Sequence, residues 1–404
     1  GAAADPAATA AGGATDVGVT ESEIRIGIAL LDVGIAREFG ANFDLGDQKA
    51  RWDALIAHQN AQGGIHGRQI VADYRTFDAG NPTETQQAAC VGWTKDTKVF
   101  TVMVHTQLTQ ASAVCLIGEG GTPVFTTDGI DESYYGNGLY FSLQASDNRI
   151  LADHAAYLID KGVLEGKTIG VLAGEGAERL AIDSTLLPAL ASAGYEVKSV
   201  EVVPATTAGT QKLPIAVSNF KAAGVDFVIV AANVVLNGPF VQTAGRSGFN
   251  PEYSLSDFNN QINDQVSSYY PDSFDGTIGL STHRFPEHRE GMPTPPADQA
   301  CYDRVADVDP KIVPVQNSAH EVGLGECAIF DAWVKAANAA GPGLTRASLI
   351  AGAEQSGTFG IAGTYDGSFG PGKHDAVDLE REVVWRKDCS CWRLVDPGQI
   401  RRIP

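Results

Sequence analysis

The segment Ile24-Arg25-Ile26-Gly27-Ile28-Ala29-Leu30-Leu31 decides the fold, because it is apolar throughout except for Arg25. A continuous apolar run of this length predicts a β-strand that is buried on both faces. After a loop, residues 49–62 carry Trp52 and Leu55 at helical spacing, and Gly63-Gly64 predicts the end of that helix. A buried strand followed by an amphipathic helix is the repeating unit of a parallel sheet covered by helices.

The same alternation continues along the chain in two series. The first, over residues 23–143, has further predicted strands at 70–77, 98–104, 123–127 and 139–143. The second, over residues 147–281, has predicted strands at 167–173, 196–203, 226–231, 253–255 and 277–281. Beyond these, we expect a long helix over 321–340 and a hairpin made by 383–385 and 392–394. The pattern predicts an α/β protein with two doubly wound parallel-sheet lobes.

The charge of the chain excludes several classes of partner. Among 404 residues, 49 Asp and Glu outnumber 29 Lys and Arg, which gives a formal charge of −20. Such a surface repels nucleic-acid phosphates and fits poorly with an anionic bilayer. The sequence also has no apolar run of about 18 residues that would predict a membrane span. We therefore expect a small-molecule ligand, no nucleic-acid partner and a monomer.

The first 20 residues differ in composition from the rest of the chain. They are rich in Ala, Gly and Thr and show no apolar periodicity, which predicts a disordered leader or tether. We expect an extracytoplasmic protein that was lipid-anchored through a removed N-terminal segment.

The six cysteines are consistent with an oxidising compartment. Two pairs are each separated by about one α-β unit, and a bridge closing such a loop stabilises by about 3 kcal/mol in the chain-entropy model. The third pair is separated by one serine. We expect three disulfides, with buried free thiols or a metal site as the alternatives. The residues are Cys90, Cys115, Cys301, Cys327, Cys389 and Cys391.

No motif in the chain predicts catalysis, a cofactor or a metal. The stretch from Gly162 to Lys167 has one residue too few between its glycines for a phosphate-binding loop and precedes its strand. His320-Glu321 begins like a zinc-protease helix, but Leu324 occupies the position of the second histidine. The enzyme alternative is a hydrolase that uses His105 and Asp128.

Polar residues at the ends of the predicted strands are the candidate ligand-binding residues. Side chains at the carboxyl ends of parallel strands face the cleft in which α/β proteins bind ligands. Each could instead cap a helix or form a turn. The candidates are Asp32, His105, Thr106, Gln107, Thr126, Thr127, Asp128, Glu175, Asn233, Asp257, His283 and Arg284.

The stretch Ala61-Gln-Gly-Gly-Ile-His-Gly-Arg-Gln-Ile70 resembles a motif of the type I periplasmic binding proteins. More narrowly, it is similar to the branched-chain amino-acid (leucine, isoleucine and valine) receptors of ABC importers. The resemblance covers nearly all of residues 20–395. Further matching stretches are 140–147, 194–197, 220–228 and 240–248.

The resemblance implies two lobes joined by three hinge crossovers, which we place near 142–147, 281–285 and 360–366. The N-terminal lobe would comprise 21–144 and 284–362, and the C-terminal lobe 145–283 and 363–404. It also implies a disulfide between Cys90 and Cys115, closure of the hinge around a ligand, and delivery of that ligand to an ABC permease. The alternative is a ligand-sensing regulatory module of the same fold.

The resemblance assigns roles to some candidate residues. Threonines after the third and fourth strands (Thr106, Thr126 and Thr127) would bind a ligand carboxylate, and Asp257 would bind an ammonium group. Two departures favour a larger or aromatic organic acid over an aliphatic amino acid: His105 stands where a small residue is usual, and Glu175-Gly176 replaces a Tyr-Gly pair. His105 and Arg284 would then act as charged hydrogen-bond donors.

Overall fold

We analysed a computed structural model of the chain, which describes residues 13–35, 43–106, 108–204, 206–232, 234–262, 270–312 and 318–404. Two candidate residues, Gln107 and Asn233, lie outside the described residues, as do residues 1–12 of the predicted leader. Residues 13–20 of that leader are ordered, contrary to the prediction. Val19 is buried in the core, and Asp16 accepts a hydrogen bond from the backbone of Arg346.

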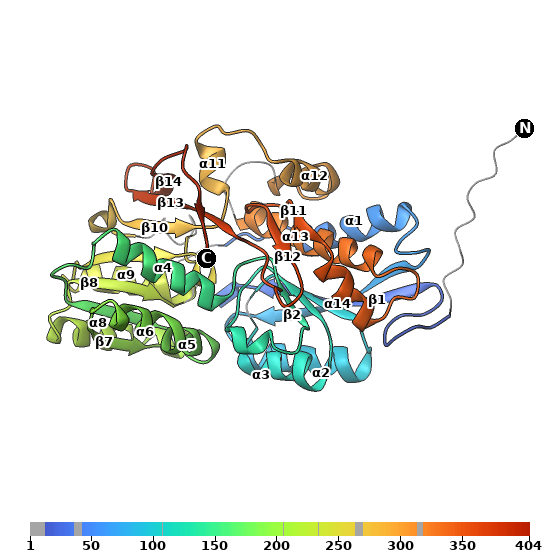
Figure 1. The fold of residues 1–404 in the computed structure, drawn as a ribbon, viewed down its shortest axis with the longest axis horizontal. Helices are drawn as coiled ribbons and strands as arrows, with labels where there is room; N and C mark the ends of the chain where they lie inside the picture. The colour runs from blue at the N-terminus through green and yellow to red at the C-terminus, as the bar shows by residue number, and fades with distance from the viewer. Residues whose placement is uncertain are drawn as a thin grey trace, which may run out of the picture.

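The first sheet consists of five parallel strands in the order β2-β1-β3-β4-β5. The predicted strand at Ile24–Leu31 is β1, an interior strand of this sheet that pairs with β2 and β3. Helices α1 (Gln48–Ala61), α2 (Pro82–Val91) and α3 (Gln110–Ala113) belong to this half (Figure 1). The strands are β1 (Glu23–Asp32), β2 (Gln69–Asp78), β3 (Thr101–Val104), β4 (Val124–Thr126) and β5 (Tyr140–Ser142).

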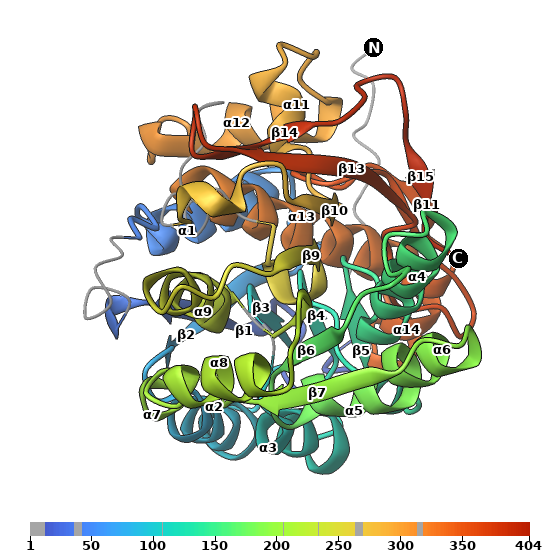
Figure 2. The ribbon, with the colours of Figure 1, turned by 90° about the vertical axis from the view of Figure 1, so that its left-hand side faces the viewer.

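The second sheet repeats this topology. Its parallel strands follow the order β7-β6-β8-β9-β10, and β13 extends the sheet as an antiparallel strand beside β10. Strands β13 and β7 lie at opposite sides of this sheet (Figure 2). The strands are β6 (Ile169–Ala173), β7 (Val197–Val202), β8 (Phe227–Ala231), β9 (Glu252–Ser256), β10 (Ile278–Ser281) and β13 (Leu379–Arg386). The helices are α4 (Asp147–Asp160), α5 (Ala177–Ala181), α6 (Leu187–Ser192), α7 (Thr207–Thr210), α8 (Leu213–Ala222) and α9 (Val234–Arg246).

The C-terminal third of the chain contributes to both halves. The predicted hairpin is confirmed: β13 pairs with β14 (Cys391–Leu394), and β15 (Arg401–Arg402) pairs with the start of β13. The predicted long helix is also confirmed as α13 (Ser318–Ala339), which contacts α1, β3 and β4 of the first half. The remaining elements are α11 (Phe285–Arg289), α12 (Pro296–Val305), α14 (Arg346–Glu354), β11 (Gly357–Phe359) and β12 (Gly367–Phe369).

The fold class is therefore confirmed as α/β, with two parallel sheets covered by helices. The lobe boundaries stay a prediction, but the contacts favour a later third crossing than residues 360–366. Phe369 packs edge-on against Phe141 with ring centroids 5.4 Å apart, and the backbone N–H of Ser142 donates to the carbonyl of His374. Residues 367–376 are thus tied to the first sheet.

One turn shows why the glycines of the family-like motif are needed. Gly64 has a φ of 67°, and a Cβ there would lie 1.9 Å from the carbonyl oxygen of Arg68. Only glycine tolerates both the left-handed backbone and this close approach. The turn delivers the chain from α1 into β2 and so sets the edge of the first sheet.

In the part of the chain that the structure describes, no helix is both long and apolar enough to cross a bilayer.

Candidate functional site

A cavity of about 1050 Å³ lies between the two sheets and is lined by loops that follow strands of both. From the first half, its walls include the residues after β1, β2, β3 and β4. From the second half, they include residues after β6, β7 and β9. One side of α13 and the segment 361–364 complete the wall. Such a position, at the carboxyl ends of parallel strands, is where α/β sheets bind ligands.

Seven of the predicted site residues line this cavity. They come from the ends of four strands and from the segment after β10, and they are Asp32, His105, Thr106, Thr127, Asp128, Glu175 and His283. Thr126, Asp257 and Arg284 lie beside the cavity without lining it. The structure thus brings together most of the candidates that it describes.

Asp257 is fully buried and pairs with His283. Its Oδ2 accepts hydrogen bonds from His283 Nδ1 at 2.8 Å, from the Thr282 backbone N–H at 2.7 Å, and from the hydroxyls of Ser281 and Thr282. The residue is only 1% exposed. Its Oδ2 is thus engaged by the protein and the residue does not line the cavity, so the ammonium-binding role implied by the resemblance stays a prediction.

The pairing fixes the charge of His283. Burial alone would lower the pKa of His283, but the Asp257 charge and hydrogen bond, with smaller contributions from Glu321 and Asp128, raise it above its ordinary value. Burial would likewise raise the pKa of Asp257, yet His283 and the donors of Thr282 lower it. The second half therefore presents to the cavity a histidine whose charged form is favoured and whose Nδ1 is already engaged by Asp257.

His105 is uncharged at neutral pH, in contrast to its predicted role. Burial lowers its pKa to about 4, and the positive charges of Arg51 and His283 act in the same direction. The ring lies against α13, where a Cβ on Gly325 would come within 2.1 Å of His105 Nε2. His105 can therefore shape the cavity and exchange neutral hydrogen bonds, but it cannot supply charge.

Arg284 does not act as a charged donor to the cavity either. Its Nε donates to the Thr364 carbonyl at 2.7 Å, its guanidinium lies 4.7 Å from the ring centre of Tyr365, and Glu287 is its ion-pair partner at 3.4 Å. These contacts join the segment after β10 to the segment around 364. Arg284 is thus a structural residue of the crossovers.

Several lining residues were missed by the sequence reasoning. Some belong to α13, whose cavity-facing positions 321, 324, 325 and 328 follow helical spacing. Others are Phe285, His288 and Asn259, which has a left-handed φ of 51°. Helical spacing shows that the four positions on α13 share one face of the helix. Nothing in the sequence indicates that this face is the one directed towards the cavity.

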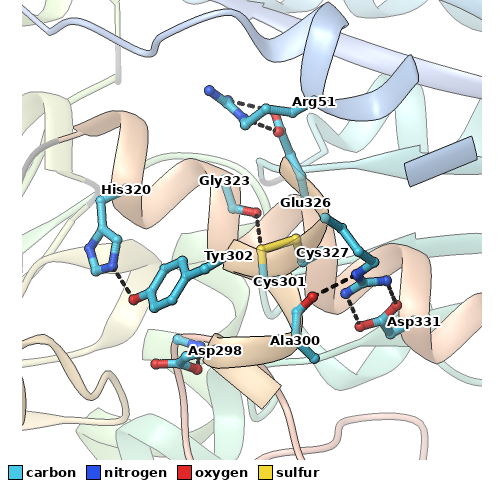
Figure 3. The surroundings of a disulfide bond; sticks show 12 residues. Arg51, Asp298, Ala300, Cys301, Tyr302, His320, Gly323, Glu326, Cys327 and Asp331 are labelled. Atoms are coloured by element: carbon cyan, nitrogen blue, oxygen red, sulfur yellow. Dashed lines mark hydrogen bonds and ion pairs between the residues drawn. A yellow bond between two sulfur atoms is a disulfide. The ribbon is translucent and has the colours of Figure 1, made fainter. Parts of the chain in front are cut away.

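The Cys301–Cys327 disulfide fixes the wall that α13 contributes (Figure 3). It joins α12 to α13, and Tyr302, the neighbour of Cys301, lies with its hydroxyl 2.6 Å from His320 Nε2. Next to Cys327, Glu326 pairs with Arg51 of α1 through two hydrogen bonds of 2.6 and 3.0 Å. The helix is thereby held against the first half from both sides.

The structure contains all three expected disulfides, Cys90–Cys115, Cys301–Cys327 and Cys389–Cys391. Among the residues that the structure describes, no group of three or more His, Cys, Asp or Glu side chains could hold a metal ion.

Comparison with known proteins places the chain in a family. Residues 23–378 match the sequence profile of a family described as periplasmic binding protein. No curated protein matches the sequence.

Solved structures share the fold at low sequence identity. A leucine-binding protein, LivK, from Thermotoga maritima is 12% identical with a TM-score of 0.68, covering 92% of this chain and 98% of that one. A fatty acid ABC transporter substrate-binding protein from Thermomonospora curvata is 15% identical with a TM-score of 0.71, covering 95% and 94%. An ABC transporter solute-binding protein from Rhodopseudomonas palustris, in complex with 3,4-dihydroxybenzoic acid, is 12% identical with a TM-score of 0.68, covering 93% and 99%. The chain belongs to the periplasmic binding protein family, in the type I fold of the branched-chain amino-acid receptor group.

Proposed function

We propose that this protein is an extracytoplasmic solute-binding protein that captures a small organic ligand and delivers it to an ABC permease. One observation carries the proposal: the large cavity lies between two parallel sheets and is lined by strand ends of both. A ligand held there contacts both halves, so its binding favours the closed arrangement of the hinge. The role is binding and transfer, without chemical change of the ligand.

The disulfides and the net charge support the proposed compartment and partners. Three disulfides fit an oxidising environment, and the charge of −20 keeps the protein off anionic lipid and nucleic acid. We propose a monomer that meets the permease in its closed form. The lipid anchor stays a prediction.

We further propose that the ligand carries a carboxylate, which binds to His283. Asp257 raises the pKa of His283 and occupies its Nδ1, so the charged form of the ring is favoured as a donor to the cavity. Charge-assisted hydrogen bonds of this kind are among the strongest in proteins. Apolar side chains such as Leu31, Phe77 and Phe285 line the same cavity and suit a hydrocarbon or aromatic body. The ligand class is thus a small organic acid, with or without an amino group.

The experiment compares three compounds that share an isobutyl group and differ in charge, with two aromatic acids. Leucine, 4-methyl-2-oxopentanoate and 3-methylbutylamine are added separately in a thermal-unfolding assay, together with benzoate and 3,4-dihydroxybenzoate. A ligand that binds only the folded protein raises Tm. We expect at least one carboxylate compound to raise Tm and the amine to leave it unchanged.

Matched variants separate the two parts of the proposal. His283→Gln should reduce the ligand-induced rise in Tm, whereas Arg284→Gln, which alters a residue outside the cavity wall, should retain it. A rise with the amine alone would contradict the carboxylate assignment but leave solute binding intact. If a broad panel of organic acids, amino acids, amides and amines gives no rise at all, solute binding itself is contradicted.

A further inference from the structure

The three disulfides differ in ring size and in exposure. Cys90–Cys115 and Cys301–Cys327 join residues that are 25 and 26 positions apart, and all four of these cysteines are buried. Cys389–Cys391 encloses a single residue in the turn between β13 and β14. Cys389 is exposed there. One disulfide of the three is therefore open to a reagent in solution.

The two sulfurs of this disulfide are not equally accessible. Cys389 lies in the exposed turn over residues 387–390, whereas Cys391 is the first residue of β14 and is only 4% exposed. Thiol exchange begins when a thiolate attacks one sulfur and expels the other as a thiolate. Exposure directs this attack to the Sγ of Cys389, so Cys391 becomes the leaving group.

The hairpin does not depend on the disulfide for its structure. Four residue pairs, from Val383 opposite Leu394 to Arg386 opposite Cys391, form the ladder between β13 and β14. Trp385 and Trp392, a directly opposed pair, are almost completely buried in the core of the second half. In the chain-entropy model a bridge also stabilises less as its loop becomes shorter. Opening this ring should therefore leave the fold in place.

The backbone inside the ring is unfavourable for its residue. Ser390 has a φ of 50°, in the left-handed region that residues with a Cβ rarely adopt. A ring of one intervening residue restricts this backbone, and opening the ring releases the restriction. Release of this restriction stabilises the reduced form relative to the oxidised form. Exposed disulfides under such constraint are the ones that exchange readily.

We propose that Cys389–Cys391 is a thiol–disulfide exchange site that oxidises a dithiol. The first thiolate of the dithiol attacks Cys389 Sγ, the Cys389–Cys391 bond breaks, and Cys391 leaves as a thiolate that takes up a proton. The second thiolate of the dithiol then attacks the dithiol's first sulfur, which is bonded to Cys389 in the mixed disulfide. Cys389 leaves as a thiolate that takes up a proton. Two electrons pass to the protein, the dithiol becomes a disulfide, and both cysteines end as thiols.

The geometry selects a dithiol over a monothiol. In the mixed disulfide with Cys389, the Cys391 thiol stays only two residues away and can close the ring again by expelling the incoming thiol. A dithiol carries its second thiolate at high effective concentration and competes with this reclosure. A monothiol must instead wait for a second molecule.

The test reduces the folded protein with dithiothreitol or, in a parallel arm, with glutathione at the same thiol concentration. Free thiols are trapped with iodoacetamide at intervals and located by peptide mass spectrometry. We expect Cys389 and Cys391 to be labelled at least about tenfold faster than the other four cysteines, and faster with dithiothreitol than with glutathione. The thermal-unfolding profile should still show a folded protein after this first step.

Two variants make the assignment specific. The double variant Cys389→Ser with Cys391→Ser should oxidise no dithiothreitol under conditions in which the native protein converts one equivalent. Ser390→Gly accepts the left-handed backbone without penalty, so its disulfide should need several-fold more dithiothreitol for half reduction. Equal labelling rates for all six cysteines would overturn the proposal. So would loss of the fold on reduction of this bond alone.

Discussion

At the level of single residues, the pairing of Asp257 with His283 decides what the cavity offers to a ligand. A buried aspartate alone would attract an ammonium group, but four donors already surround its Oδ2. The group of this pair that reaches the cavity is therefore His283, which lines the wall together with carboxylates such as Asp128 and Glu175. Strand-end reasoning identified both residues, yet it could not show that one neutralises the other, because their contact joins the end of β9 to the segment after β10.

This pairing predicts how binding depends on pH. The pKa of His283 is raised above its ordinary value of 6.5, so the imidazolium is kept to higher pH than in a free histidine and is lost as pH rises through the raised pKa. Affinity for a carboxylate ligand should be full below about pH 6.5 and fall at alkaline pH. Isothermal titration at a series of pH values, with a carboxylate that raises Tm, measures this dependence.

Variants provide the control for this pH profile. His283→Gln should weaken binding by about 1.5–3 kcal/mol, the contribution of a charge-assisted hydrogen bond, and should remove the alkaline fall. His58→Gln alters an exposed histidine of α1 and should leave the profile unchanged. An alkaline fall that persists in His283→Gln would assign the titration to another group.

A second residue-level prediction concerns the buried charges around Arg51. Its side chain is inaccessible and pairs with Asp309 and Glu326, which are 4% and 1% exposed. Arg51→Met leaves two buried carboxylates without their cation and should lower the free energy of unfolding by about 3–5 kcal/mol. Lys49→Met breaks the exposed pair with Asp53 on the same helix and should cost less than about 1 kcal/mol. Urea unfolding of both variants measures the difference, and equal losses would contradict the buried-network interpretation.

At the level of elements, α13 connects the core of the first half to the cavity. Its helical character was predictable from its length and apolar pattern, and its role in the site was not. The sequence reasoning examined His320-Glu321 only as a zinc-binding motif. Which side of a helix faces a cavity depends on how it packs on α1, β3 and β4, and these contacts join residues more than 190 positions apart.

Two glycines of α13 allow this element to be tested. A Cβ on Gly325 would lie 2.1 Å from His105 Nε2 and 3.1 Å from Thr127 Cγ2, both in the cavity wall. Gly325→Ala should therefore displace His105, reduce the cavity and weaken ligand binding by at least about tenfold. Gly323→Ala, two residues earlier, would instead press on Ile312, which lies outside the cavity wall. We expect that variant to lose stability but to keep its affinity; equal affinity losses would show that α13 acts only through folding.

At the level of the whole molecule, the two sheets were predictable because each is a series of local strand–helix units with clear apolar periodicity. The third crossing was harder to place. Residues 357–376 form a short two-stranded sheet and return to Phe141 and Ser142, and these contacts have no periodic signature in the sequence. The same limit applies to the site, because the pairing of Asp257 with His283 joins two segments that no periodic pattern in the sequence connects.

The crossovers are linked directly to the candidate site. Gln144, after β5, donates its side-chain N–H to the Thr282 hydroxyl at 2.6 Å, and that hydroxyl donates to Asp257 at 2.9 Å. Asp257 holds His283, whose backbone forms a bridge to Thr364. A ligand bound to His283 is therefore two hydrogen-bonded residues away from the first crossover. This network is a physical route by which binding can bias the hinge.

Small-angle X-ray scattering tests whether ligand binding closes the molecule through this network. With a saturating carboxylate that raises Tm, the radius of gyration should decrease; an unchanged radius would contradict hinge closure. Thr282→Val removes the hydroxyl that joins Gln144 to Asp257, so the ligand-free variant should open further and bind more weakly by about 1–3 kcal/mol. Thr101→Val is the matched control, because it removes one buried hydroxyl bond, to the Pro123 carbonyl, inside the first sheet. It should lower stability without changing the radius, and if both variants scatter alike, the crossover network does not govern the hinge.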